Sequence, residues 1–414
     1  MPYSSLEAKE ISQLCTVVDC EHKTAPYVEE SDYLVVRTSN VRNGRLLMAD
    51  MKYTTVDGYK EWTQRAIPEY GDVLFTREAP AGESCLVPEN KKVCMGQRMV
   101  MLRPKEGVTD PVFLSLILNT ERTKADISRL SIGSTVSRIN IADIKKLKVS
   151  SPPLPEQRKI GKILSTWDKA IATTEKLIDT SKQQKKALMQ QLLTGKKRLV
   201  NPETGEAFEG EWEEVRLGDI VDRSICYGVL KPGEHTENGI PLLRIQDLKT
   251  NELKLDKMMR ITDELHHEFK RTILREGDLV ISIVGTLGKV LMVPKELDGA
   301  NITRAFAVIG VSRHDSLFVK QYLSSDYIQE WLLNTATGNA QKVLNIAAIK
   351  KLNLCMPSLF EQQKIASALN AADKEIEVLE AKLAHFKQEK KALMQQLLTG
   401  KRRVKVDDAE TVQS

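Results

Sequence analysis

The sequence predicts an α+β protein with two domains of mixed α/β structure. We expect the domains at opposite ends of two long antiparallel coiled-coil helices, related by a pseudo-two-fold internal repeat. The string KKALMQQLLTG occurs at residues 185–195 and again, unchanged, at 390–400. The offset of 205 residues holds without a gap back to Ile141 and Ile346. Each copy also ends a long heptad pattern, and a repeat of this kind defines the architecture.

The first helix is expected from Glu156 to Leu193, because its apolar residues recur at alternating steps of four and three. That spacing is typical of helices that pack along their length. We predict helix–helix packing by Ile160, Leu164, Trp167, Ile171, Ile178, Leu188, Leu192, Ile365, Leu369, Ile376, Leu379, Leu383, Phe386, Leu393 and Leu397. Lys185 and Lys390 interrupt both seams at the same place, where a polar residue can define the register.

Signals for the helix ends agree with this pattern. Ser358 and Glu361 match a capping box, and prolines lead into the first helix. Gly195 and Gly400 stand where a helix is expected to end, and basic triplets follow them. About 38 residues would span about 57 Å, which is longer than a helix of a small domain. The second helix must therefore run back along the first if their seams pair.

The repeat divides the chain into two domains, two helices and a tail. The expected boundaries are 1–150, 151–198, 199–355, 356–403 and 404–414. The first domain is predicted to contain a hairpin within 33–46 that turns at Asn43-Gly44, strands at 71–78 and 95–104, a helical run at 110–130 and a loop at 133–140. The second domain repeats this plan at 240–255, 276–290, 301–310 and 338–345.

Composition is ordinary for a soluble protein, with 41% apolar and 28% charged residues. There is no apolar run of transmembrane length and no signal peptide at the N-terminus, so we expect a cytoplasmic protein without membrane contact. The six cysteines show no disulfide spacing, which agrees with reduced thiols. Cys15, Cys20 and His22 lack a second ligand cluster, so no metal site is expected.

Four motifs together indicate a family. They are PPLPEQ at 152–157, the two KKALMQQLLTG segments, PLLR-x-x-D at 241–247 and a GST-type loop at 133–135. In this order the chain resembles, over essentially its whole length, the DNA-specificity subunit of Type I restriction-modification systems. The first domain departs from the pattern, because VVR-x-x-N at 35–40 lacks the proline and aspartate, and the Trp-x-x-Val-x-Leu-Gly opening of 212–218 has no match there.

The resemblance implies that each variable domain is a target-recognition domain for one half of a bipartite, asymmetric site in double-stranded DNA. It implies that the helices set the half-site spacing and dock two methyltransferase subunits, which endonuclease-translocase subunits join in phage defence. S-adenosylmethionine for DNA methylation would be held by the methyltransferase partner, and this chain would bind no cofactor.

The residues themselves predict a non-catalytic chain. No Asn/Asp-Pro-Pro-aromatic loop for a flipped base is found, and Gly285–Val290 is too short for a P-loop. Two alternatives remain at this point. A stand-alone methyltransferase or nuclease would need a cofactor pocket and a catalytic loop. A structural coiled-coil adaptor would join two proteins without selective DNA binding.

The net charge of +5 is modest for a DNA-binding protein. It indicates either that partner subunits share the phosphate contacts or that the basic residues are concentrated on one face. Polar loop residues beside predicted strands are the candidates for base contacts, because arginine and lysine favour guanine, and asparagine and glutamine favour adenine. The candidates are Arg77, Arg98, Ser134, Thr135, Ser137, Arg138, Thr286, Lys289, Arg304, Asn339, Gln341 and Lys342. Arg37 and Arg244 occur in both halves, so we interpret them as structural.

Overall fold

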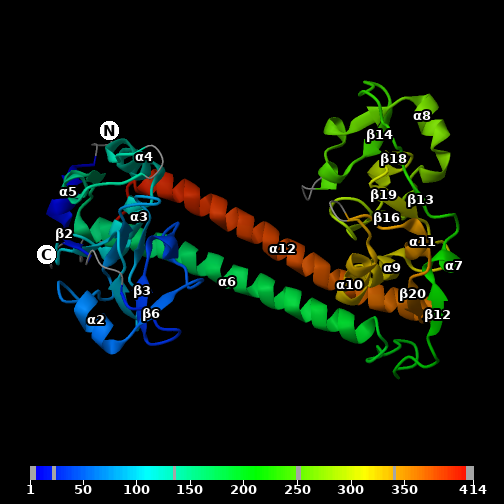
Figure 1. Cartoon of the computed structure of the whole chain (residues 1–414), viewed down its shortest axis with the longest axis horizontal. Helices are drawn as coiled ribbons and strands as arrows, with labels where there is room; N and C mark the ends of the chain where they lie inside the picture. The colour runs from blue at the N-terminus through cyan, green and yellow to red at the C-terminus, as the bar shows by residue number, and fades with distance from the viewer. Residues whose placement is uncertain (1–5, 21–24, 134–136, 249–252, 339–341, 407–414) are drawn as a thin grey trace. The chain divides into compact units, whose positions relative to one another are not determined.

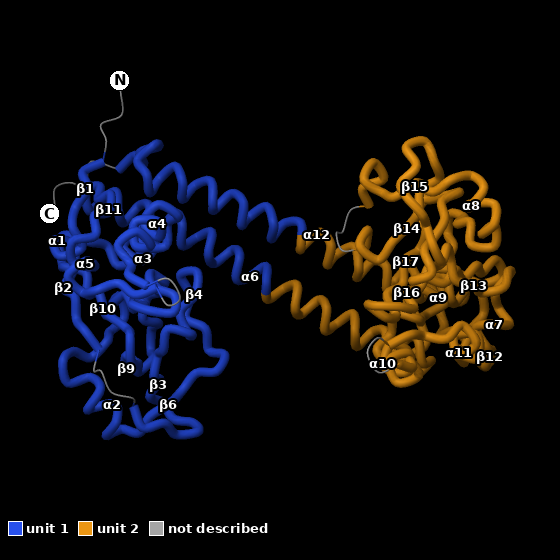
Figure 2. The backbone as a smooth tube through the Cα atoms, turned by 45° about the horizontal axis from the view of Figure 1, so that its top comes forward, with its two compact units in different colours: residues 1–175, 381–414 blue, residues 176–380 orange. Residues whose placement is uncertain are grey.

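The computed structural model describes residues 6–20, 25–133, 137–248, 253–338 and 342–406. The chain forms two compact units, shown in separate colours in Figure 2. Unit 1 consists of residues 1–175 with 381–414, and unit 2 of residues 176–380. Each unit therefore combines one mixed domain with part of each long helix.

Unit 1 is built from short strands and helices (Figure 1), which enclose one large hydrophobic cluster and two smaller ones. Its strands are β1 Ala8–Glu10, β2 Cys15–Asp19, β3 Tyr33–Val36, β4 Val41–Arg42, β5 Arg45–Leu46, β6 Lys52–Thr54, β7 Val73–Thr76, β8 Ser84–Leu86, β9 Lys92–Met95, β10 Met99–Pro104 and β11 Lys148–Ser150. Its helices are α1 Ile11–Leu14, η1 Thr38–Asn40, α2 Val56–Trp62, α3 Pro111–Leu118, α4 Glu121–Leu130 and α5 Ile141–Lys146, followed by α6 Leu154–Leu192.

Unit 2 repeats the order of these elements. Its strands are β12 Glu213–Arg216, β13 Cys226–Tyr227, β14 Ile240–Leu243, β15 Met259–Ile261, β16 Leu279–Ser282, β17 Val290–Met292, β18 Asn301–Ile302, β19 Phe306–Ile309 and β20 Asn353–Met356. Its helices are α7 Leu217–Ile220, η2 Ile245–Leu248, η3 Leu255–Lys257, α8 Asp263–Glu268, η4 Lys270–Thr272, η5 Lys295–Leu297, α9 Ser316–Leu323, α10 Asp326–Thr335 and α11 Ile346–Lys350, followed by α12 Leu359–Leu397.

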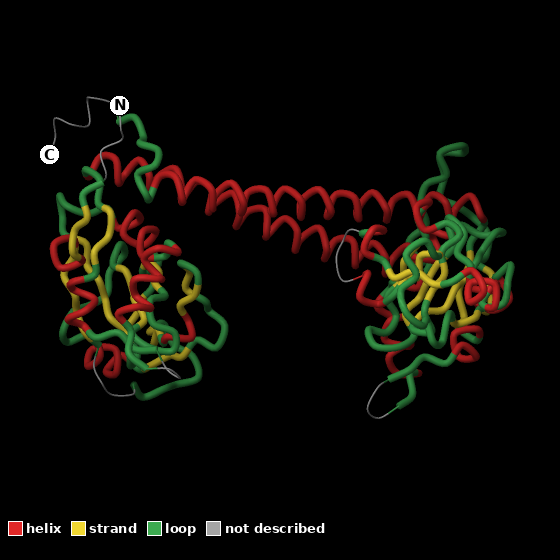
Figure 3. Tube along the Cα trace, turned by 90° about the horizontal axis from the view of Figure 1, so that it is seen from above, coloured by secondary structure: helices red, strands yellow, loops and turns green. Residues whose placement is uncertain are grey.

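Three sheets of unit 1 recur with the same topology in unit 2, and unit 1 has a further two-stranded sheet, β4-β5. A four-stranded sheet has the order β2-β10-β7-β8 in unit 1 and β13-β19-β16-β17 in unit 2. A three-stranded sheet has the order β6-β3-β9 in one unit and β15-β14-β18 in the other, and in each the middle strand pairs in parallel with the last. A two-stranded ladder, β1-β11 or β12-β20, completes each unit. The structural repeat thus extends well beyond the identical sequence segments. Figure 3 shows that both units combine helices and strands.

Two of the expected elements in the first domain are each divided in two. The helical run at 110–130 forms α3 and α4, because the Thr120 hydroxyl accepts a hydrogen bond from the Thr123 N–H and starts a new helix. The strand expected at 95–104 is formed only from Met99 onward, as β10, and its first residue, Met95, instead ends β9. Arg98 lies between them with φ +69°, a left-handed conformation that interrupts an extended strand.

The hairpin prediction is confirmed over a shorter range. Strands β4 and β5 are joined by Asn43 and Gly44, with φ of +49° and +80°. Positive φ at both central residues is the geometry of a type I′ turn, which asparagine and glycine tolerate. The 3-10 helix η1 separates this hairpin from β3, so residues 33–46 are not one continuous pair of strands.

Helices α6 and α12 each contain 39 residues, close to the predicted bounds. The Glu361 N–H donates to the Ser358 hydroxyl at 3.4 Å, as expected for an N-cap. The Glu361 carboxylate accepts from Arg198 instead of completing the capping box. No helix in the described part of the chain is long and apolar enough to cross a membrane.

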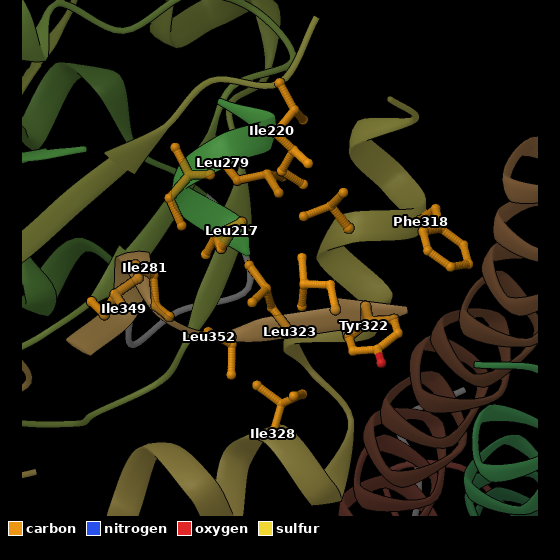
Figure 4. Packing of buried hydrophobic residues seen from close by; sticks show 14 of the residues in the cluster. Leu217, Ile220, Leu279, Ile281, Phe318, Tyr322, Leu323, Ile328, Ile349 and Leu352 are labelled. Atoms are coloured by element: carbon orange, nitrogen blue, oxygen red, sulfur yellow. The ribbon is translucent and has the colours of Figure 1, made fainter. Parts of the chain in front are cut away.

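Each unit closes its core around the start of one long helix and the end of the other. In unit 1, Ile160 and Leu164 of α6 join Leu397 and Leu398 in the core beneath α3 and β10. In unit 2, Ile365 and Leu369 of α12 join Leu192 and Leu193 in the corresponding core. Figure 4 shows residues of this second core from α7, β16, α9 and α11. Burial of these side chains anchors the helix ends to the domains.

Candidate nucleic-acid interface

Each unit contains the same buried ion pair where its helix segments meet. In unit 1, Arg403 donates to the Glu156 carboxylate with Nε–Oε1 at 2.7 Å. In unit 2, Arg198 donates to Glu361 with Nε–Oε1 at 2.6 Å. Glu156 and Glu361 are almost fully buried, and hydrogen bonding to Glu156 raises the pKa of Arg403 above its ordinary value. A buried carboxylate requires such a partner, so these pairs hold the helix ends together.

Two further ion pairs are repeated along the helices. Lys390 binds Asp168 at 2.7 Å in unit 1, and Lys185 binds Asp373 at 2.6 Å in unit 2. Lys387 binds Glu175 at 2.9 Å, and its counterpart in unit 2 is Lys182 with Glu380 at 2.6 Å. In both units, the residue numbers of the α12 partners fall as those of the α6 partners rise. The helix segments within each unit are therefore antiparallel.

Basic partners also affect the ionisation of the Glu175 carboxylate. Hydrogen bonding from Lys387, with a smaller contribution from Arg45, lowers the pKa of Glu175 below its ordinary value. Arg45 belongs to the β4–β5 hairpin, and its Nη1 lies 3.2 Å from Glu175. This contact connects the first domain to α6.

The predicted seam residues differ in their burial. Those that are buried are Ile160, Leu164, Ile171, Ile178, Leu192, Ile365, Leu369, Ile376 and Leu397. Those that are half-buried are Trp167, Leu379, Leu383, Phe386 and Leu393. Leu188 is 37% exposed. Trp167 and Phe386 meet edge to face with ring centroids 5.6 Å apart, so aromatic packing joins the two helices in unit 1.

The glutamine of the PPLPEQ motif ties the start of α6 to the first domain. The Gln157 amide oxygen accepts from the Asp110 N–H at 3.0 Å, and its nitrogen donates to the Pro152 carbonyl at 2.8 Å. Gln362 makes the equivalent bonds to Asp315 and Pro357 at 3.0 and 2.8 Å. Sequence reasoning used this motif only to identify the family. Its buried amide has a structural role.

The first domain has the same opening as the second, although its sequence departs from the motif. Strand β1 pairs with β11 as β12 pairs with β20. A side chain added at Gly195 would meet Trp212, and one added at Gly400 would meet Leu6. Leu6 therefore occupies the position of Trp212. Leucine is a smaller apolar residue than tryptophan, so a search for the tryptophan of the motif could not identify this position.

The Arg-x-x-Asn and Arg-x-x-Asp motifs form the same turn. The Asn40 side chain accepts from the Arg37 N–H at 3.1 Å, and Asp247 accepts from the Arg244 N–H at 2.8 Å. Asp247 also pairs with the Arg244 guanidinium at 2.9 Å, whereas Arg37 donates to the Asp50 carbonyl at 2.6 Å. These bonds agree with the structural interpretation of both arginines.

Three loop segments meet beside the end of β7 in unit 1 and of β16 in unit 2. The Arg77 N–H donates to the Arg98 carbonyl at 2.8 Å, and the Ile283 N–H donates to the Ala305 carbonyl at 2.8 Å. Isolated bridges then join Glu78 to Arg138 in unit 1, and residue 284 to residue 343 in unit 2. We call each of these two places a loop junction. The repeated backbone bonds make their positions directly comparable.

The loop junction of unit 1 brings two predicted arginines together. Arg98 and Arg138 are exposed, and both bind Glu78, a carboxylate that sequence reasoning did not select. Arg77 is buried and pairs with Asp19 at 3.1 Å, so its side chain points into the domain. Ser137 is half-buried beside Arg138. Ser134 and Thr135 lie outside the described residues.

The candidates of unit 2 that the structure describes are exposed. Thr286 and Lys289 line a hollow of about 170 Å³ with Ile245 and Leu248. The Lys289 ammonium donates to the Leu248 carbonyl. The remaining candidates are Arg304 and Lys342, which are exposed, and Asn339 and Gln341, which lie outside the described residues.

Within the described residues, no group of three or more histidine, cysteine, aspartate or glutamate side chains could hold a metal ion. What the loop junction of unit 1 offers instead is the exposed hydrogen-bonding side chains of Arg98 and Arg138. Such side chains can bind base edges or phosphates.

A sequence model of the Type I restriction modification DNA specificity domain matches the chain twice, at residues 4–182 and 209–388. The chain belongs to this DNA-specificity family. It is 28% identical over 338 residues to the Type I restriction enzyme MjaVIII specificity subunit of Methanocaldococcus jannaschii, covering 78% of this chain and 77% of that one. It is 27% identical over 424 residues to the putative MjaX specificity subunit of the same organism, covering 96% and 94%.

Solved structures of the Type I specificity family share this fold. The crystal structure of a Type I restriction-modification S subunit from M. genitalium matches with a TM-score of 0.60 at 16% identity, over 96% of this chain and 98% of that one. A chain from a structural study of the assembly and conformational transition of a Type I system matches with a TM-score of 0.55 at 18% identity, over 96% and 99%.

Proposed function

We propose that the chain is the non-catalytic DNA-specificity subunit of a Type I restriction-modification complex. The first target-recognition domain, residues 1–150, reads one half of a bipartite asymmetric site, and the second, residues 199–355, reads the other. The observation that carries this proposal is the pair of loop junctions, which have the same backbone bonds and different side chains. Two readers on one framework suit two unlike half-sites.

Helices α6 and α12 act as the spacer in this proposal, as an antiparallel coiled coil with the domains at opposite ends. The repeated ion pairs of Lys390 and Lys185 support it, because equal contacts in each unit favour a symmetric strut. A stiff strut of defined length would set the number of unread base pairs between the half-sites.

The strut is also where we expect two copies of one methyltransferase to dock, with endonuclease-translocase subunits joining them. Gln190 and Gln191 are exposed, as are their counterparts Gln395 and Gln396. Their identity in both copies suits binding by two identical partners. S-adenosylmethionine would belong to those partners, and DNA would be the ligand of this chain.

A paired insertion tests the spacer. One heptad is inserted after Glu175 and another after Glu380, at the limits of the two units, so that the ion pairs within each unit are kept. One heptad adds about 10 Å of helix, so the spacer should lengthen by about three base pairs of 3.4 Å. Methylation mapping in cells that express the chain with its methyltransferase measures the spacer.

A matched insertion of the same length in the exposed turn at 201–206 controls for general disturbance and should leave the spacer unchanged. An unchanged spacer in the helix variant would reject the proposal that the helices set the half-site spacing.

Exchange of residues 1–150 for the corresponding domain of a relative should alter one half-site. Altered recognition of both halves would reject the division of labour, and an absence of selective methylation with partners present would favour a structural adaptor.

A further inference from the structure

The two loop junctions differ most at three equivalent positions. Glu78, Arg98 and Arg138 in unit 1 correspond to Val284, Ala305 and Val343 in unit 2, as the repeated backbone bonds and bridges require. One junction therefore presents two cations around a carboxylate, and the other presents small apolar side chains.

The Glu78 carboxylate forms an ion pair with the Nε atom of each arginine. Arg98 Nε lies 3.1 Å from Glu78 Oε2, and Arg138 Nε lies 3.5 Å from Oε1. The two arginine side chains are 56% and 55% exposed, while that of Glu78 is only 17% exposed. In both ion pairs the arginine atom given for the contact with Glu78 is Nε. A guanidinium held at Nε can present its two Nη groups to a ligand as a pair of donors.

The backbone conformation of Arg98 also indicates a functional role for its side chain. Arg98 has φ +69°, a conformation that glycine or asparagine adopts more readily than arginine. Strained positions of this kind cluster at functional sites. The equivalent position in unit 2, Ala305, is not among the described residues with positive φ, so the shared fold does not require the strain.

We propose that Arg98 and Arg138 bind guanine in the half-site read by the first domain, and that Glu78 is the positioning residue that orients them. An arginine donates two parallel hydrogen bonds to guanine O6 and N7 in the major groove. This proposal rests on the proposed function and assigns one base to part of it. The apolar junction of unit 2 lacks such donors, so its domain must recognise a different feature there.

Phosphate is the other ligand of paired guanidinium donors. The Glu78 carboxylate between the arginines cancels part of their positive charge, which weakens attraction to a phosphate. Guanine carries no net charge, and its edge requires the orientation that a fixed carboxylate provides. The charge balance therefore favours a base over the DNA backbone.

The experiment uses the full chain expressed with its methyltransferase, and maps methylation on a library of randomised DNA sites. Arg98→Gly removes the side chain at a position where glycine relieves the backbone. It should reduce the guanine preference at one base of one half-site about tenfold to a hundredfold, the value of a good bidentate contact. Arg138→Gln should lose guanine at another base and gain adenine, which glutamine favours.

Glu78→Gln keeps the shape of the side chain and removes the charge that holds the arginines. It should weaken the preference at both guanines by a smaller factor while the other half-site stays unchanged. Arg129→Gln is the matched control, because Arg129 is also an exposed arginine of unit 1 bound to a carboxylate, Asp126 at 2.7 Å. Its methylation pattern should equal that of the wild type.

Several results would overturn the guanine assignment. One is an equal loss of methylation at all bases with a weaker salt dependence, which identifies phosphate contacts. Others are an unchanged pattern in Arg98→Gly, or a wild-type half-site whose affected bases are not guanine. Wild-type complexes without sequence-selective methylation would instead overturn the proposed function. Thermal unfolding of each variant checks the fold, and Arg98→Gly should unfold at the wild-type temperature or above.

Discussion

The helix ends of the two units are nearly identical, whereas their loop junctions are not. Arg403 with Glu156 and Arg198 with Glu361 make the same buried ion pair. At the loop junction, Arg98 is replaced by Ala305 on the same backbone framework. The buried ion pair of the helix ends is therefore the same in both units, whereas Glu78, Arg98 and Arg138 of the loop junction have no counterpart of the same type in unit 2.

This difference separates two kinds of constraint. A buried carboxylate such as Glu361 cannot lose its arginine without a large cost, so the pair is kept in both copies. An exposed loop side chain costs little to change, because water replaces its contacts. Divergence confined to such loops allows two domains with one fold to recognise different ligands.

The largest expected effect comes from breaking the ion pairs of the helix ends. Arg198→Met leaves the buried Glu361 carboxylate without its partner and should cost about 3–5 kcal/mol of unfolding free energy. Arg403→Met should cost somewhat less, because its side chain is 35% exposed against 22% for Arg198. Urea unfolding of the full chain measures both.

Lys186→Met is the control for these two variants. Lys186 pairs with Asp326 at 2.6 Å, but both side chains are exposed, so its loss should cost far less than the loss of Arg198. A loss for Arg198→Met no larger than that of the control would contradict the importance of the buried pair.

A smaller effect should distinguish the middle ion pairs of the two units. Lys185→Asp places two carboxylates together, with only the Gln321 amide, 2.7 Å from Asp373, as compensation. In unit 1, Arg45 lies 4.0 Å from Asp168 and can offset Lys390→Asp. We expect about 1–3 kcal/mol of destabilisation for Lys185→Asp, within the usual range for coupled pairs, and less for Lys390→Asp. Thermal and urea unfolding provide the comparison.

The double variant Lys185→Asp with Asp373→Lys restores opposite charges and should recover most of the loss. Equal destabilisation by both single variants would show that Arg45 offers no compensation. Failure of the double variant to recover stability would mean that the contact depends on packing and not on charge.

The reactivity of the cysteine thiols should distinguish the two units in the folded wild-type chain. Burial raises the pKa of the Cys15, Cys85 and Cys94 thiols to about 12, so thiolate is scarce at neutral pH. Cys355 is exposed and Cys226 is half-buried, and both belong to unit 2. At pH 8, iodoacetamide should label these two in the folded chain, and Cys15, Cys85 and Cys94 only after unfolding. Mass spectrometry of digested protein measures each site.

The same labelling locates the effect of the ion-pair variants. Arg403→Met should expose the unit 1 thiols at lower urea than Arg198→Met does, because its lost contact belongs to unit 1. Rapid labelling of Cys15 or Cys85 in the folded wild type would contradict their burial.

Several elements were predictable because their signals are local. The Asn43-Gly44 turn and the two long helices follow from backbone preference and heptad spacing. The break between α3 and α4 at Thr120 was missed, because the apolar pattern continues across it and a capping threonine carries a weaker signal. The sequence did not reveal that Leu6 is equivalent to Trp212, because the equivalence appears only when Leu6 is seen beside Gly400 and Trp212 beside Gly195.

The candidate site was only partly predictable for the same reason. Arg98 and Arg138 were selected by residue type and loop position, but they are 40 residues apart in the chain. Their meeting at Glu78 depends on three segments that converge in space. Arg77, of the same type and at the same loop junction, is turned inward to Asp19. Residue type cannot distinguish these two orientations.

By itself, the sequence determined the internal repeat, the family and the long helices, because these depend on order and spacing along one chain. The tertiary structure alone decided which charges are partnered and buried and which are exposed. The contacts that settle this, such as Arg403 with Glu156, join residues 247 positions apart. The free energy of a charge depends on its surroundings, and those exist only after the chain has folded.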